Sequence, residues 1–245
     1  LIGLGNVGAT VAYTLRERKL CEKIARFDKK EGLAKAEVND LRDGMVRRDG
    51  NVELVEGRSK DLDESDIIIF APGDIRILQK NHDLLEEFKY TKTCAEEWAK
   101  KIKESKFNGI LISLTNPCDV IAGYMQELTG LPKERVIGTG TILDTARMKN
   151  AVASYLDVDP SSIDGYVLGE HGKSQFVAWS QVNIATKPIS ELLDKKTIDC
   201  IEHSTRSKAF ETISAKGYTS YGIANATAII VETIFTDAKT VLPVS

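Results

Sequence analysis

The feature that most constrains the fold of this chain is a glycine-rich turn followed by alternating strand and helix patterns. The segment Gly3–Gly8 reads G-L-G-N-V-G and leads into a helical pattern over Asn6–Leu20. Uniformly apolar strands follow at Ile67–Phe70 and Ile110–Leu114, separated by a long amphipathic helix over Leu84–Glu104. Strands that are apolar on both faces and alternate with helices are typical of a parallel sheet covered by helices. The sequence therefore predicts an α/β, Rossmann-type doubly wound parallel sheet.

The pattern changes after Gly140, where an α+β arrangement of predicted helices and short strands replaces the strict alternation of strand and helix. We therefore expect an NAD-type Rossmann domain over residues 1–139 and a second, α+β domain over residues 140–245. The further elements expected in the first domain are strands at Lys23–Phe27, Val52–Val55 and Arg135–Ile137 and helices over Glu31–Met45 and Asp119–Leu128. Those expected in the second are helices over Asp144–Tyr155, Ile198–Ser214 and Tyr221–Phe235 and short strands near Tyr166 and over Phe176–Val182.

Both ends of the chain are expected to lack residues. Leu1 and Ile2 directly precede the glycine turn, whose supporting strand needs several residues upstream. Thr240–Ser245 is a strand-like run with nothing after it to pair or cover it. We therefore expect the second domain to be incomplete at its carboxyl end.

The G-x-G-x-x-G turn is suited to a dinucleotide. Its first glycine permits a tight turn, its second lets the main chain approach a pyrophosphate, and its third packs the helix against the strand. Asp28 ends the next predicted strand, at the expected interval of about 20 residues. A carboxylate there accepts hydrogen bonds from the ribose hydroxyls of NAD and repels the 2′-phosphate of NADP, and Lys29 and Lys30 beside it are expected to be solvated. The predicted cofactor-binding residues of this region are Gly3, Gly5, Asn6, Val7, Gly8 and Asp28.

His171 is the candidate proton carrier. It lies in the segment Gly165–Ser174, G-Y-V-L-G-E-H-G-K-S, in a predicted loop of the kind where functional residues concentrate. Asp144 offers a partner carboxylate, and Arg147 lies one helical turn from it on the same face. A hydride carrier, a proton carrier and a carboxylate-binding arginine together are what oxidation of a 2-hydroxy acid requires.

Five blocks of this sequence occur in the same order as in L-lactate/malate dehydrogenases, and the resemblance extends over essentially the whole chain. The last three blocks are most similar to the L-2-hydroxyisocaproate dehydrogenase branch. The five blocks are Gly3–Gly8, Thr115-Asn116-Pro117, Gly138–Arg147 (G-T-G-T-I-L-D-T-A-R), Leu168–Gly172 (L-G-E-H-G) and Lys216–Ser220 (K-G-Y-T-S).

The resemblance implies a role for each matching residue. His171 would donate a proton to the 2-oxo carbonyl, and Asp144 would orient its imidazole. Arg147 would hold the substrate carboxylate in a two-point contact that lysine could not copy. Asn116 would contact both the nicotinamide ribose and the substrate, and Thr219 would line the pocket. The cofactor would be NAD.

The sequence departs from the family pattern in the loop from Gly73 to about Phe88. Members of the family carry an arginine there that polarises the substrate carbonyl, and this chain has Leu84 at that position. Three explanations are open. The chain is catalytically weakened, since one preorganised contact contributes about 3 to 4 kcal/mol to catalysis; Arg76 or Lys80 replaces the missing arginine; or the sequence omits residues of a mobile loop. The third is favoured.

The resemblance to the L-2-hydroxyisocaproate branch implies a wide pocket for branched aliphatic 2-oxo acids. The apolar neighbours of Arg76 agree with this, so branched or medium aliphatic 2-oxo acids rank first, with lactate second. Arg76 itself is a candidate substrate-binding residue and suggests malate third, because an arginine near this position in malate dehydrogenases binds a second carboxylate. A catalytically weakened NAD-binding homologue or NAD sensor and an NAD-dependent glycosidase, which would need a metal, are the alternatives from other classes.

Composition excludes several other classes of protein. The chain has 245 residues, a net charge of -3 and no basic stripe with interleaved aromatic residues, which argues against a nucleic-acid partner. Its apolar runs are far shorter than a membrane span, and no secretory signal opens it. Its four scattered cysteines form no metal-binding motif and favour a reducing cytoplasm. The resemblance adds a homotetramer or homodimer as the expected assembly, with a small 2-hydroxy or 2-oxo acid as the binding partner.

Overall fold

A computed structural model describes residues 1–47, 51–77 and 84–245, and leaves out the side chains of residues 84–86. Its centre is a parallel sheet in which the amino-terminal segment lies in the middle, because Ile2 bridges to both Phe27 and Phe70. From one edge to the other the sheet contains β2 (Glu53–Glu56), β1 (Lys23–Arg26), the segment at Ile2, β3 (Ile67–Phe70), β4 (Ile110–Ser113) and β5 (Val136–Gly138). The order of strands reverses between the Ile2 segment and β3, which is the switch point of a doubly wound sheet. The predicted fold class is confirmed.

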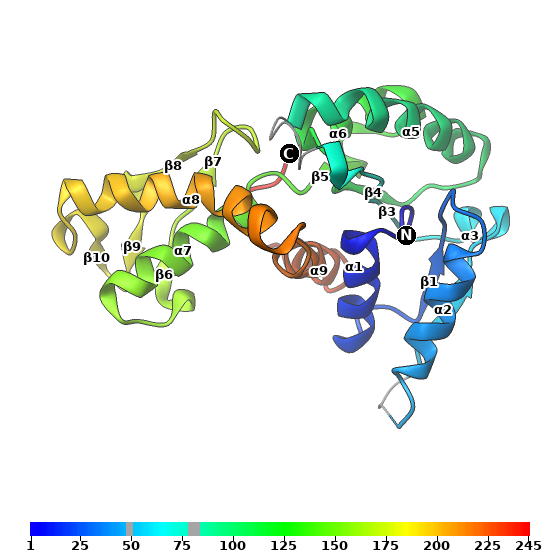
Figure 1. The fold of residues 1–245 in the computed structure, drawn as a ribbon, viewed down its shortest axis with the longest axis horizontal. Coiled ribbons are helices and arrows are strands. Elements are labelled where there is room, and N and C mark those ends of the chain that lie inside the picture. Colours follow the sequence, from blue (N-terminus) through cyan, green and yellow to red (C-terminus); the bar gives the residue numbers. More distant parts are fainter. Residues whose placement is uncertain (48–50, 78–83) are drawn as a thin grey trace.

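Helices cover both faces of this sheet (Figure 1). Phe70, Leu111, Ala95, Trp98 and Ile121 belong to the core between the sheet and two of these helices, α5 and α6. The helical spacing of Ala95 and Trp98 thus reflects a buried face, as the amphipathic pattern predicts. The helices of this part are α1 (Asn6–Glu17), α2 (Leu33–Asp43), α3 (Ser59–Asp63), α5 (Leu84–Glu104), α6 (Cys118–Thr129) and the 3-10 turn η1 (Lys133–Arg135).

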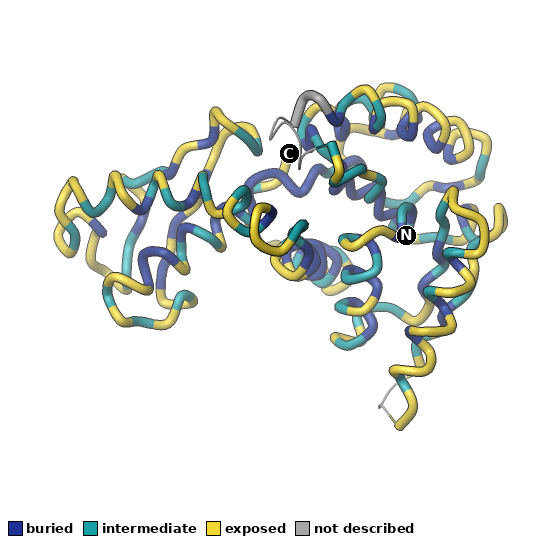
Figure 2. The backbone as a smooth tube through the Cα atoms, viewed as in Figure 1, coloured by how far each residue is buried: buried dark blue, intermediate teal, exposed yellow. Residues whose placement is uncertain are grey.

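The second part of the chain forms a separate lobe around its own core, in which Met148, Val152, Ile163 and Ile201 are buried (Figures 1 and 2). Its strands form two small antiparallel sheets: in one, β6 (Ile163–Asp164) and β10 (Lys187–Pro188) flank β9 (Asn183–Ile184), and in the other, β7 (Val167–Leu168) pairs with β8 (Phe176–Val177). Its elements are α7 (Ile142–Leu156), η2 (Pro160–Ser162), β6 (Ile163–Asp164), β7 (Val167–Leu168), β8 (Phe176–Val177), η3 (Trp179–Gln181), β9 (Asn183–Ile184), β10 (Lys187–Pro188), η4 (Ile189–Glu191) and α8 (Lys195–Lys216).

The last helix, α9 (Tyr221–Phe235), leaves this lobe and packs against α1 of the first. Fully buried Ala224 and Ala228 share one core with Val11 and Ala12, and such small side chains let two helices approach closely. At the surface of this contact Arg18 forms a 2.5 Å ion pair with Glu232. Although the second lobe has its own core, its last helix therefore belongs to a hydrophobic core of the first lobe.

Thr240–Ser245, expected to be strand-like, is not assigned as a strand but lies beside the end of β5. Gly138 donates its N–H to the Ser245 carbonyl at 2.7 Å, and Ser245 donates its N–H to the Gly138 carbonyl at 3.0 Å. The expectation of one strand over Phe176–Val182 was wrong, since a 3-10 turn interrupts it before β9. The chain needs this turn because β8 pairs with β7 whereas β9 pairs with β6.

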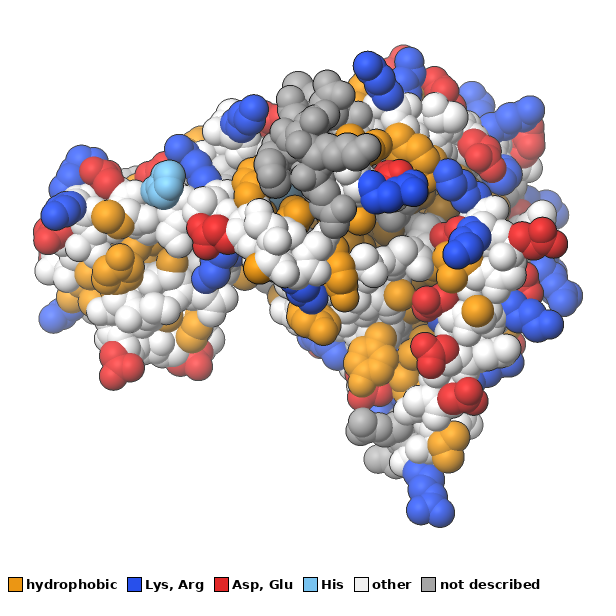
Figure 3. All heavy atoms as spheres, viewed as in Figure 1, with side chains coloured by type: hydrophobic (Ala, Val, Ile, Leu, Met, Phe, Trp, Pro, Cys, Tyr) orange, Lys and Arg blue, Asp and Glu red, His pale blue; other side chains and the backbone are white. Residues whose placement is uncertain are grey.

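No helix in the described part of the chain combines the length and apolarity that a membrane crossing requires. On the face drawn in Figure 3, basic and acidic side chains are interspersed over both lobes.

Candidate functional site

The glycine loop, residues Gly3–Gly8, lies where the Ile2 segment ends and α1 begins. Gly3 has a φ of +85°, and a Cβ there would stand 2.7 Å from the main-chain nitrogen of Pro72. A Cβ on Gly8 would stand 1.9 Å from the Gly3 carbonyl oxygen. Both positions therefore require glycine within the fold itself.

Gly5 differs from the other two glycines because nothing lies within 4 Å of a Cβ built there. The fold gives no steric reason for glycine at this position. Gly5 caps the amino terminus of α1, where free N–H groups and the helix dipole favour a phosphate. The open space and the exposed Asn6 beside it fit a pyrophosphate that needs close access to the main chain, so the loop fits a dinucleotide.

Asp28 lies beside the glycine loop just beyond β1. Its two carboxylate oxygens accept the main-chain N–H groups of Leu4 at 2.7 Å and Lys30 at 2.8 Å. These bonds fix the carboxylate, and its remaining lone pairs can still accept ribose hydroxyls. The adjacent Lys29 is exposed, as expected for a solvated lysine, and its ammonium lies 4.4 Å from the centre of the Tyr90 ring. That contact directs the lysine to α5 and away from a salt bridge with Asp28.

His171, Asp144 and Arg147, the charged cluster, come together at the start of α7. His171 Nδ1 lies 2.5 Å from Asp144 Oδ2, and Arg147 Nη1 donates to Asp144 Oδ1 at 2.7 Å. Asp144 is only 1% exposed. Because an ionised carboxylate only accepts hydrogen bonds, Nδ1 must carry the proton, which leaves Nε2 as the ring atom available for proton exchange.

The pKa of Asp144 lies below its ordinary value. Burial acts in the opposite direction and is the largest single influence, because it penalises the charged form. The hydrogen bond from His171 and the positive charges of His171 and Arg147 together outweigh it. Asp144 is therefore held as a buried carboxylate between the imidazole of His171 and the guanidinium of Arg147.

Two threonine hydroxyls connect β7 to the start of α7 beside this cluster. Thr141 donates its hydroxyl to the Val167 carbonyl at 2.6 Å, and Val167 donates its N–H to the Thr145 hydroxyl at 2.9 Å. Both threonines flank Asp144 at the start of α7, and Val167 begins the strand that leads to His171. The two bonds thus fix the strand against the helix.

Asp119 is a site residue that the sequence reasoning missed. Its carboxylate accepts the main-chain N–H of His171 at 2.9 Å, which anchors the histidine loop to the first turn of α6. The sequence did show an acidic residue three positions after Asn116, at a helix start that follows a strand. Its contact with His171 could not be predicted, because the two residues are 52 positions apart.

Asn116 and Thr219, two further predicted substrate-site residues, are half-buried and lie in loops. Asn116 follows β4 at the carboxyl edge of the sheet, and its carbonyl accepts the Thr91 hydroxyl at 2.9 Å. Thr219 lies between α8 and α9. Gly222, in the first turn of α9, packs against Leu143, the neighbour of Asp144, because a Cβ on that glycine would stand 2.7 Å from its side chain. Thr219 is thereby brought towards the start of α7.

Arg76 pairs with a neighbouring carboxylate. Its guanidinium makes a two-point contact with Asp74, at 2.8 and 2.6 Å, and its side chain is 81% exposed. Asp144, by contrast, is the carboxylate that contacts His171 and Arg147. Lys80 and the side chain of Leu84 lie outside the described residues.

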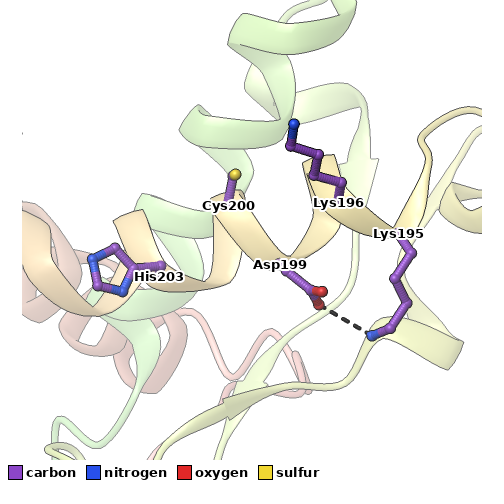
Figure 4. A pocket seen from close by; sticks show the side chains of 5 residues that line it. All are labelled: Lys195, Lys196, Asp199, Cys200 and His203. Carbon is purple, nitrogen blue, oxygen red and sulfur yellow. Dashed lines mark hydrogen bonds and ion pairs between the residues drawn. The ribbon is translucent and has the colours of Figure 1, made fainter.

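One open hollow lies on the outer surface of α8 and contains none of the predicted site residues (Figure 4). Its lining residues are Lys195, Lys196, Asp199, Cys200 and His203. Lys195 and Asp199 form a surface ion pair of 3.1 Å. Within residues 1–47, 51–77 and 84–245, no three histidine, cysteine, aspartate or glutamate side chains are grouped to hold a metal ion.

A glycine loop at the switch point of a parallel sheet, in one chain with a buried carboxylate that contacts a histidine and an arginine, is typical of nicotinamide-dependent oxidoreductases. Comparison with protein families narrows this class. Residues 1–138 match the lactate/malate dehydrogenase NAD binding domain, and residues 141–245 match the lactate/malate dehydrogenase alpha/beta C-terminal domain. The chain belongs to the lactate/malate dehydrogenase family, and NAD is its cofactor.

Individual relatives agree with this assignment. L-lactate dehydrogenase 1 of Bifidobacterium longum is 35% identical to this chain over 252 residues, which cover 100% of it and 79% of the relative. L-lactate dehydrogenase of Halalkalibacterium halodurans is also 35% identical, with 100% and 78% covered. The minor L-lactate dehydrogenase from Enterococcus mundtii, solved in a ligands-bound form, superimposes with a TM-score of 0.94 at 33% identity and with 100% and 79% covered.

Proposed function

We propose that this protein transfers hydride between NAD(H) and an L-2-hydroxy acid or its 2-oxo acid. The observation that carries the proposal is the charged cluster, in which one buried carboxylate contacts both a histidine ring and a guanidinium. A structural ion pair needs no histidine with a free ring nitrogen beside it, whereas proton exchange with a hydroxyl or carbonyl does.

The residues divide the chemistry as follows. Arg147 has five N–H donors and uses Nη1 for Asp144, so the rest of its fork is available to a substrate carboxylate. His171 Nε2 gives a proton to the carbonyl oxygen during reduction and takes it back during oxidation. Asp144 stabilises the imidazolium that forms after oxidation of the hydroxyl. The nicotinamide cofactor would supply the hydride acceptor for oxidation as NAD and the hydride donor for reduction as NADH.

The glycine loop and Asp28 are proposed to bind the cofactor. The amino terminus of α1 would bind the pyrophosphate, and Asp28 the ribose hydroxyls. Asn116 lies at the carboxyl edge of the same sheet and would contact both nicotinamide ribose and substrate. Thr219 would line the substrate pocket.

The substrate is proposed to be a branched or medium aliphatic 2-oxo acid, with pyruvate second and oxaloacetate third. The ion pair between Arg76 and Asp74 supports the third place of oxaloacetate. A guanidinium already paired with a carboxylate is less available to the second carboxylate of a dicarboxylic acid. An assembly of two or four copies and a cytoplasmic location complete the proposal.

The decisive test is the initial rate of NADH oxidation by the full chain with pyruvate, 4-methyl-2-oxopentanoate and oxaloacetate in parallel. We expect the highest kcat/KM with 4-methyl-2-oxopentanoate. Turnover with oxaloacetate alone would instead support a malate dehydrogenase. Binding of NADH without turnover of any of the three would overturn the proposal and favour a catalytically weakened NAD-binding homologue.

A further inference from the structure

Glu87 is a buried carboxyl in the first turn of α5. It is 3% exposed and shares the buried face of the helix with Thr91, Ala95 and Trp98. Burying a carboxyl is costly unless hydrogen bonds compensate for the lost water. The main chain of Asp74 provides one, because its N–H donates to Glu87 Oε1 at 2.7 Å.

The segment that Glu87 holds, residues 71–74, follows β3 at the switch point of the sheet. Pro72 packs against the glycine loop, since a Cβ on Gly3 would stand 2.7 Å from its nitrogen. The carbonyl of Pro72 also accepts the Thr115 hydroxyl at 2.8 Å. Segment 71–74 therefore lies between the glycine loop and the Thr115-Asn116 turn.

Gly73 lies directly against the same carboxyl. A Cβ added to it would stand 2.9 Å from Glu87 Oε1. The atom that would have to move is the end of a flexible side chain, so an alanine at this position would displace the carboxyl and leave the main chain in place. Gly73 thus offers a second, independent way to disturb the contact.

The next turn of α5 contacts the proposed substrate site. Thr91, one turn after Glu87, is fully buried and donates its hydroxyl to the Asn116 carbonyl at 2.9 Å. Its oxygen also lies 3.2 Å from the Glu87 carbonyl. Two consecutive turns of α5 therefore contact segment 71–74 through Glu87 and Asn116 through Thr91.

We infer that Glu87 is a positioning residue of the 2-oxo acid site, which fixes segment 71–74 relative to Asn116. The inference rests on the proposed function, because Asn116 is expected to contact substrate. Burial raises the pKa of the Glu87 carboxyl, the N–H of Asp74 lowers it and the charge of Asp74 raises it. Whether ionised or protonated, the carboxyl keeps an oxygen that accepts the Asp74 N–H.

The test compares Glu87→Gln, which keeps an acceptor oxygen, with Glu87→Leu, which has similar size and no acceptor. Loss of a hydrogen bond to a buried acceptor corresponds to roughly a tenfold change in a binding constant. We expect Glu87→Leu and Gly73→Ala each to raise the KM for the 2-oxo acid about tenfold with a smaller change in kcat. Glu87→Gln should stay near the wild type. Glu97→Leu, on an exposed position of the same helix, is the matched control.

Hydrogen exchange of the peptide containing Asp74, measured in the full chain, makes the outcome independent of turnover. Faster exchange in Glu87→Leu and slow exchange in Glu87→Gln would support the inference. Unchanged exchange in Glu87→Leu, or a KM unaffected despite faster exchange, would overturn it. A wild type that turns over no 2-oxo acid overturns the proposed function and this role together, whereas normal turnover with unchanged exchange overturns only the role of Glu87.

Discussion

The glycine loop is proposed to bind the cofactor, and the charged cluster is proposed to bind the substrate and exchange its proton. Different kinds of contact form the two sites. The loop is a run of six residues whose contacts are mainly main chain, and Asp28 joins it by accepting the main-chain N–H of Leu4. The charged cluster uses side chains from two segments 27 residues apart and buries the carboxylate between them.

The difference shows where each site is vulnerable. A main-chain site is damaged by added volume, since a single Cβ closes the space that a phosphate needs. A side-chain site is damaged by the loss of one partner, because the remaining charge then stays buried without compensation. Substitutions at the two sites should therefore separate cofactor binding from proton transfer.

The largest effect is expected at His171. Glutamine in its place removes the group that exchanges the proton, so kcat should fall by about 10²- to 10⁴-fold. The affinity for NADH should stay unchanged, because the glycine loop lies on the other lobe. Initial rates and a fluorescence titration of NADH measure the two quantities. His203→Gln, on the exposed surface of α8, should alter neither.

Arg147→Lys tests the carboxylate contact while keeping the charge. A lysine cannot make the planar two-point contact of a guanidinium, so we expect the KM for the 2-oxo acid to rise about tenfold or more. Arg206→Lys, on the exposed surface of α8, where it pairs with Glu202, is the control. An unchanged KM would show that Arg147 serves only as the ion-pair partner of Asp144.

Two alanine substitutions in the glycine loop should give different results. In Gly8→Ala the new Cβ would overlap the Gly3 carbonyl, so we expect a loss of about 1 to 3 kcal/mol of stability together with weaker NADH binding. In Gly5→Ala the Cβ meets open space, so stability should hold while NADH binding weakens. Urea unfolding and NADH titration distinguish them. Equal NADH affinity in Gly5→Ala and wild type would contradict the pyrophosphate site.

The smallest effect concerns acid stability. The pKa of Asp144 is lowered in the folded state, so the carboxylate stabilises the fold above the unfolded pKa near 3.8. This contribution is lost as pH falls through the lower, folded value. Asp144→Asn should therefore show a shallower loss of unfolding free energy below about pH 4. Urea unfolding across that range measures it, with the exposed Asp164→Asn as control; equal slopes for Asp144→Asn and wild type would refute the coupling.

Much of the site was predictable because its parts are short-range. The Asp144–Arg147 contact follows from helical spacing, and the place of Asp28 follows from the length of one strand–helix unit. The hydrogen bond from His171 to Asp119 and the contact of Lys29 with the Tyr90 ring were not predictable, because each contact joins segments far apart in sequence. Glu87 left a signal: it occupies the helical spacing of Ala95 and Trp98, a pattern that marks a buried face whatever the residue type.

The sequence by itself determined the parallel sheet, the glycine loop and the family, because periodicity and contiguous motifs express local geometry. Tertiary structure alone decided that α9 packs on α1, that Thr240–Ser245 pairs with Gly138 and that the Glu87 carboxyl holds Asp74. These contacts depend on which surfaces the folded chain brings together, and burial then sets their strength. Local pattern carries no record of a partner tens of residues away.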